Sequence, residues 1–178
     1  MSLLVVGTDG PVVRALRDAQ PPADPGGVLA AIGDARPSEL VIVALPAPAG
    51  PVGAMPTDAL AELVGRMLTP AFTAAAALAD GGEAVRIAIV CPAGGVLPDH
   101  ADGARSVAAA GLAMLAEICA ATPGLTANAI AVADDVPAAE TAEAVRFALA
   151  QPSLNGATIR LDGGRDAALA AETRAEGD

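Results

Sequence analysis

The sequence predicts an α/β fold built on a parallel sheet. Short apolar runs rich in Val and Ile, which are typical of buried strands, recur near residues 2–6, 40–45, 85–90, 125–132 and 157–161. Segments with helical apolar spacing separate them, so strands and helices alternate. Hydrophobic residues make up 53% of the 178 residues, which is enough for one domain with a sizeable core. We expect a doubly wound sheet of about five strands with right-handed crossovers over residues 1–164, and a polar tail over 165–178.

In the first half of the chain, the sequence predicts a strand, two short helices, a second strand and a loop. After the strand at 2–6, Asp9 can cap a helix that has Pro11 in its first turn. A second brief helix is expected over residues 28–35. The strand at 40–45 is apolar throughout, as in strands covered on both faces, and the proline-rich segment 46–56 predicts an irregular loop.

A long helix should follow this loop. Thr57 suits its N-cap, and the apolar spacing continues to about Ala79. Pro70 lies inside the pattern, so we expect it to kink or split the helix.

The second half of the sequence contains the segment where we expect a functional site. The strand at 85–90 is followed by a loop over 91–102, a helix from about 103 to 121 and the strand at 125–132. A further helix is expected over 138–150, before the last strand. Ligands of open parallel sheets lie outside the carboxyl ends of the strands, and the loop at 91–102 should lie there.

Charge and cysteine content exclude several classes of function. The formal net charge is −11 and every basic residue is Arg, so we expect no nucleic-acid partner. Cys91 and Cys119 are too few for a disulfide framework or a zinc site, which favours a reducing, cytoplasmic compartment. No segment has the pattern of a signal peptide or of an uninterrupted membrane span.

Four segments, in order and spacing, resemble motifs of the short-chain dehydrogenase/reductase family. They are 40–48, similar to the "NNAG" strand and loop; 87–94, similar to "IVNISSxxG"; 126–131, similar to "RVNAIAPG"; and 155–164, similar to "ITGQTIxVDGG". The resemblance covers roughly residues 39–164 and implies a Rossmann-like fold.

The departures from the family matter for function. The resemblance implies a catalytic Tyr-x-x-x-Lys pair, yet the sequence contains no Tyr and no Lys. In register with the family, Asp102 stands at the Tyr position, Ser106 at the Lys position, Cys91 at the catalytic Ser and Met67 near the helix Asn. None of these is chemically equivalent, so hydride-transfer chemistry is not expected.

The cofactor-binding half is also reduced. Where the family has Gly-x-x-x-Gly-x-Gly, residues 7–11 keep two glycines and add a carboxylate and Pro11, which lacks an N–H. The sequence segment between Gly7 and Leu40 is long enough for two short helices but not for two further strands. We therefore expect no nicotinamide cofactor and no metal.

Cys91, Asp99, His100 and Asp102 form the only cluster with possible acid–base or nucleophilic chemistry. The alternative is that Cys91 is a small buried residue and His100 a solvated loop residue, and this alternative is favoured. Asp134-Asp135 could bind a cation, but a helix-capping loop is the preferred interpretation. Arg160 is expected at an edge or interface, and Cys119 in the core.

The helix at 103–121 is apolar nearly all round, which predicts burial on every side. The resemblance implies that this helix and the one at 138–150 pack against a neighbouring subunit. The leading hypothesis is thus a non-catalytic partner subunit, paired with itself or with a full-length paralogue. The alternatives are a non-redox enzyme (a dehydratase, cyclase or isomerase of an acyl or polyketide-like substrate) and a small-molecule binding module in the same crevice.

Overall fold

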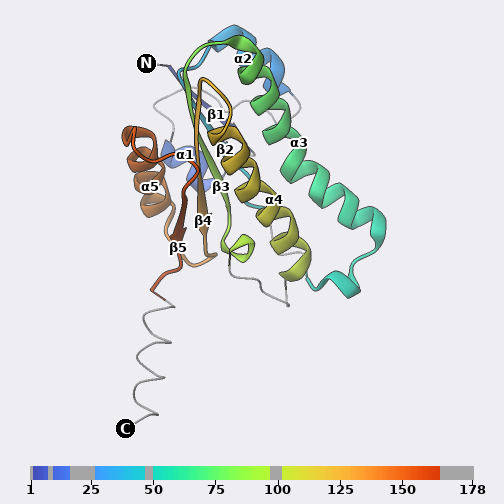
Figure 1. Cartoon of the computed structure of the whole chain (residues 1–178). Helices are drawn as coiled ribbons and strands as arrows, with labels where there is room; N and C mark the ends of the chain where they lie inside the picture. The colour runs from blue at the N-terminus through green and yellow to red at the C-terminus, as the bar shows by residue number, and fades with distance from the viewer. Residues whose placement is uncertain (1, 8–9, 17–26, 47–49, 97–101, 165–178) are drawn as a thin grey trace.

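The computed structural model describes residues 2–7, 10–16, 27–46, 50–96 and 102–164. These residues form one parallel sheet in which sequence order equals spatial order, β1-β2-β3-β4-β5 (Figure 1). The strands are β1 (Leu3–Gly7), β2 (Glu39–Val43), β3 (Val85–Pro92), β4 (Leu125–Val132) and β5 (Thr158–Leu161). The predicted α/β sheet of five strands is confirmed, and each strand lies within two residues of its expected bounds.

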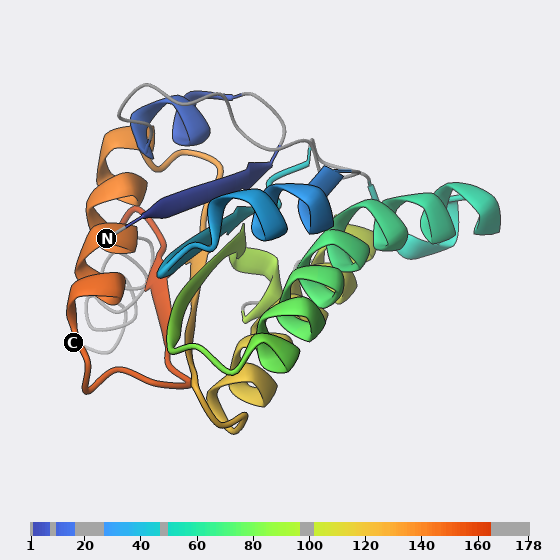
Figure 2. The same cartoon turned by 90° about the horizontal axis from the view of Figure 1, so that it is seen from above.

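Helices cover both faces of the sheet, as expected for a doubly wound fold (Figure 2). They are α1 (Pro11–Leu16), α2 (Val28–Ala35), α3 (Thr57–Gly81), α4 (Gly103–Ala120) and α5 (Ala138–Ala150), with short 3-10 turns η2 (Val52–Ala54) and η3 (Ala93–Gly95). Helices α2, α3 and α4 share one apolar core with the sheet, and α1 and α5 share the other. The tail at 165–178, Asp9 and the loop at 97–101 lie outside the described residues.

One connection departs from the expected handedness. The chain moves across the sheet in the same direction from β2 to β3, from β3 to β4 and from β4 to β5. Helices α3 and α4 make the first two connections on one face, whereas α5 makes the third on the opposite face. The third crossover therefore has the opposite hand, and right-handed crossovers throughout are excluded.

Two details of α3 also differ from expectation. Pro56 precedes the helix, no side chain caps its N-terminus, and Thr57 is its first helical residue rather than its N-cap. Pro70 lies inside α3, yet the helix is continuous from Thr57 to Gly81. Of the two expected effects, a kink or a split, the split is therefore absent.

Small residues allow α3 and α4 to pack closely. A Cβ added at Gly111 of α4 would lie 3.2 Å from Leu68 Cδ2 of α3. Along the central strand β3, alternate side chains serve the two cores: Ile87, Ile89 and Cys91 face α3 and α4, and Ala88 and Val90 face α5. Both faces of β3 are covered, which explains its continuous apolar sequence.

Two asparagines fix the connection from β4 to β5. The buried Asn128 donates from Nδ2 to Leu154 O (3.0 Å), and its Oδ1 accepts from Ala157 N (3.0 Å). Asn155 accepts from Ala127 N at 3.0 Å and donates to Ala120 O at 3.0 Å. The edge strand β5 is thus held by side-chain bonds in addition to its ladder with β4.

Candidate functional site

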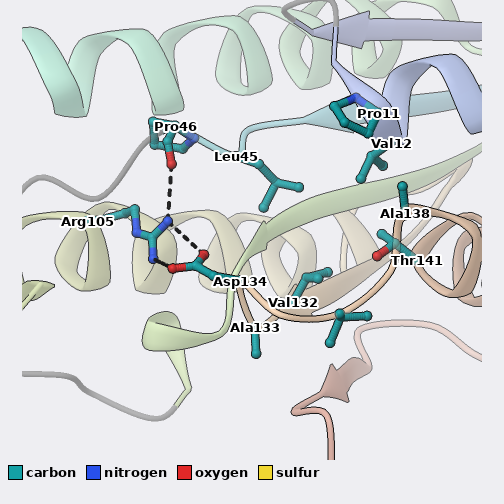
Figure 3. A pocket seen from close by; sticks show the side chains of 11 residues that line it. Pro11, Val12, Leu45, Pro46, Arg105, Val132, Ala133, Asp134, Ala138 and Thr141 are labelled. Carbon is teal, nitrogen blue, oxygen red and sulfur yellow. Dashed lines mark hydrogen bonds and ion pairs between the residues drawn. The ribbon is translucent and has the colours of Figure 1, made fainter.

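A crevice of about 390 Å³ opens at the carboxyl ends of the strands, where the sequence placed a site (Figure 3). Its walls follow three strands: Pro11 and Val12 come after β1, Leu45 and Pro46 after β2, and Val132 to Asp134 at the end of β4. The start of α5 and Arg105 of α4 complete the lining. Most of this lining is apolar carbon, and the charged groups are confined to Arg105 and Asp134.

Arg105 is the best-anchored side chain of the crevice. Its Nη1 donates to Asp134 Oδ1 at 3.0 Å and to Pro46 O at 3.1 Å, and its Nη2 donates to Asp134 Oδ2 at 2.8 Å (Figure 3). Its Nε forms an ion pair with Asp102. The arginine therefore joins α4 to the loops after β2 and β4, above the end of the intervening β3.

The electrostatics of this cluster follow from its composition. Burial on its own would lower the pKa of Arg105, but the hydrogen bonds and charges of Asp134 and Asp102 outweigh it and raise the pKa. The guanidinium is thus permanently charged. The guanidinium is paired with two carboxylates, those of Asp134 and Asp102.

Among the described residues nearest β1, one backbone donor that an anion could use is missing. Helix α1 is only six residues long and begins at Pro11, which has no N–H to offer an anion. Gly7 has a packing role instead, because a Cβ at this position would lie 2.8 Å from Val43 O of β2. The structure does not describe residues 8 and 9.

The predicted catalytic cluster is not assembled by the described residues. Asp99 and His100 lie outside them. Cys91 is fully buried in the core beneath α3 and α4, and burial raises the pKa of its thiol to about 12, so the thiolate is scarce at neutral pH. Asp102 is buried and held by Arg105. These facts favour packing and positioning roles for Cys91 and Asp102.

The other positions singled out from the sequence have structural surroundings. Met67 is buried in the core. Ser106 lies so close to Gly94 that a Cβ added at Gly94 would collide with Ser106 Oγ. Cys119 is in the core as expected, and Arg160 is on the edge strand, 3.4 Å from Asp162.

The Asp134-Asp135 pair has a different role from the expected one. Asp134 pairs with Arg105, and α5 begins after Pro137 without a side-chain cap, so the predicted capping role is wrong. Within the described ranges, no group of three or more His, Cys, Asp or Glu side chains could hold a metal ion. Arg105 itself was missed, since the sequence shows it only as a basic residue in an alanine-rich helix, 29 positions from Asp134.

Helix α4 is not buried on every side within one chain. Val107 (63% exposed), Met114 (55%) and Ile118 (53%) form an exposed apolar row, the α4 stripe. Helix α5 lies on the opposite face of the sheet, so α4 and α5 do not form one continuous surface. Among the described helices, α4 is long and apolar enough to cross a membrane, and half of it is buried within the protein.

No protein-family model and no curated protein matches the sequence. Solved structures do match. A small-chain dehydrogenase in complex with NADPH has 14% identity and a TM-score of 0.77, covering 91% of this chain and 96% of that one. A mutant of a Serratia marcescens short-chain dehydrogenase/reductase has 16% identity and a TM-score of 0.76, covering 91% and 96%.

A 3-hydroxyacyl-CoA dehydrogenase type-2 from Mycobacterium avium is also similar, with 20% identity and a TM-score of 0.62, covering 78% of this chain and 72% of that one. At these identities the likeness establishes the fold. The chain has the Rossmann-like fold of short-chain dehydrogenases/reductases, as the sequence motifs implied.

Proposed function

We propose that this protein is a non-catalytic member of the short-chain dehydrogenase/reductase fold that acts as a structural or partner subunit. The observation that carries the proposal is chemical: a chain with no Tyr and no Lys cannot supply the phenol and ammonium of the catalytic pair. The partner is a second copy of this chain or a complete paralogue.

The crevice supports the same conclusion. Arg105, the one cation that lines it among the described residues, is already bonded to Asp134, Asp102 and Pro46 O. A dinucleotide pyrophosphate would meet a guanidinium that is already paired with two carboxylates, and the ring of Pro11. A non-redox enzyme is the weaker proposal, since Cys91 is buried and its burial raises the pKa of the thiol.

The surface that fits a partner is the α4 stripe. Val107, Met114 and Ile118 are large apolar side chains exposed on one helix. Contiguous exposed apolar surface of this kind marks interaction sites in soluble proteins. Helix α3 packs beside α4, and its exposed Phe72 adds a fourth large apolar side chain on this side of the sheet.

Solution mass tests the proposal. We expect the purified protein to be a dimer by light scattering, or to form a stable complex with a complete paralogue. Met114→Glu should dissociate either assembly. Phe147→Glu is the matched control, because Phe147 is equally exposed (53%) but lies on α5, across the sheet.

Three outcomes would refute this function or move its surface. A chain that is monomeric alone and does not bind the paralogue has no subunit role. Hydride transfer to or from a pyridine nucleotide by the purified chain would show that it is an enzyme. Dissociation by Phe147→Glu rather than Met114→Glu would move the partner surface to α5.

A further inference from the structure

We propose that the crevice at the carboxyl ends of β1, β2 and β4 binds a small, uncharged, largely apolar molecule with at most one hydrogen-bond donor. This inference is independent of the subunit role, because the crevice and the α4 stripe use different residues. A similarly folded dehydrogenase is in complex with the dinucleotide NADPH, and the ligand proposed here has a different chemistry.

The residues that line the crevice indicate that its ligand is largely apolar. Side chains of Val12, Leu45, Val132, Val136 and Ala138 surround the space. Val12 and Ala138 belong to α1 and α5, Val132 ends β4, and Leu45 and Val136 lie in loops. Figure 3 shows the four that it labels, Val12, Leu45, Val132 and Ala138, around a common space. The volume of about 390 Å³ lies within the range of roughly 300–1,000 Å³ that is typical of small-molecule pockets. Apolar walls with a few polar groups at one end are the usual composition of such sites.

The polar residues at one end of the crevice, Arg105 and Asp134, indicate which ligand charge it can accept. Both oxygens of Asp134 accept from Arg105, and Arg105 also bonds to Asp102 and Pro46 O. The guanidinium is thus already paired with two carboxylates, so it is not available as a free cation for a ligand carboxylate, sulfonate or phosphate. Since a carboxylate oxygen can accept more than one hydrogen bond, Asp134 can still receive one from a ligand N–H or O–H.

The remaining polar group in the lining does not change this conclusion. Thr141 is fully buried, and its hydroxyl donates to Pro137 O at 3.3 Å. Its hydrogen is therefore directed to the backbone of its own helix. Among the described residues, the crevice thus offers a ligand mainly apolar contact, with the Asp134 carboxylate as its charged acceptor, and these features define the proposed class.

Two fluorescent probes that differ only in charge test the proposal. N-phenyl-1-naphthylamine is neutral and has one N–H, and 1-anilinonaphthalene-8-sulfonate is the same molecule with a sulfonate added. The chain has no Trp and no Tyr, so its own emission is small. We expect saturable binding of the neutral probe, with the sulfonate at least about tenfold weaker.

Neighbouring residues on α5 provide matched variants. Ala138 lines the crevice, whereas Ala139 does not and is exposed. Ala138→Phe should fill the space and weaken binding of the neutral probe by at least about tenfold, and Ala139→Phe should leave it unchanged. Val136→Phe is a second filling variant should Ala138→Phe fail to fold, which circular dichroism would reveal.

The α4 stripe is the competing site for an apolar probe. Met114→Glu should leave the affinity for the neutral probe unchanged. Binding that is lost in Met114→Glu and retained in the filling variants would place the probe on the stripe and overturn the proposal. Equal affinity for both probes, or no binding by the folded protein, would also overturn it.

Discussion

Arg105 of α4 and Asp134 after β4 form a two-bond ion pair, with Nη1 to Oδ1 at 3.0 Å and Nη2 to Oδ2 at 2.8 Å. The two side chains differ in surroundings, since the side chain of Arg105 is 11% exposed and that of Asp134 is 58% exposed. The pair ties the helix to a strand end while one wall of the crevice stays open to solvent. The same contact therefore stabilises the fold and sets the charge of the candidate site.

We expect Arg105→Met to destabilise the protein by about 3–5 kcal/mol, because it leaves the buried Asp102 without its guanidinium. Arg66→Met is the control, since Arg66 makes only an exposed pair with Glu62 at 3.8 Å. Its expected loss is within about 0.5 kcal/mol. Urea unfolding measures both, and similar small losses would show that the Arg105 cluster has no structural role.

Gly7 should not tolerate a side chain. In Gly7→Ala the new Cβ would lie 2.8 Å from Val43 O, so β1 and β2 must separate, at a cost of about 1–3 kcal/mol. Gly33→Ala is the matched control, because nothing lies within 4 Å of its added Cβ inside α2. It should be stabilising by about 0.5–1 kcal/mol through helix propensity. A Gly7→Ala protein as stable as Gly33→Ala would contradict the close approach of the strands.

Asn128→Ala should loosen the edge of the sheet. The substitution leaves Leu154 O and Ala157 N without their side-chain partner, which costs about 1–3 kcal/mol for buried polar groups. Amide hydrogen exchange should accelerate in β5 more than in β3. Thr126→Ala, on the same strand but half-buried, should leave β5 protected. Uniform acceleration over the whole sheet would show that the asparagine supports global stability only.

The strands and helices could be predicted from the sequence because each carries its own local signal. Continuous Val and Ile runs mark β2 and β3, and apolar spacing marks α3. The face on which α5 packs could not be read in this way. Helical periodicity identifies an apolar side but not the side of the sheet it covers, and the usual handedness rule gave the wrong answer here.

The site was harder to predict for a related reason. The position at the strand ends follows from the fold class, but Arg105 and Asp134 meet only through tertiary structure. The reactive residue types made Cys91 a candidate, but the favoured alternative, a small buried residue, is the one that the structure confirms. The exposure of the α4 stripe also depends on what packs beside the helix, so composition alone predicted burial on every side.

Alkaline pH should destabilise the protein through Cys91. Burial raises the pKa of its thiol from 9.0 to about 12, so between these values the unfolded thiol ionises while the folded one keeps its proton. Stability is then fully present below about pH 9 and falls by about 1.4 kcal/mol per pH unit toward pH 12. Because the chain has no Tyr and no Lys, the two thiols are the main side chains that titrate there. Denaturant unfolding between about pH 8 and pH 11 measures the slope, which Cys91→Ala should reduce; an unchanged slope in that variant would mean that the Cys91 thiol ionises in the folded protein.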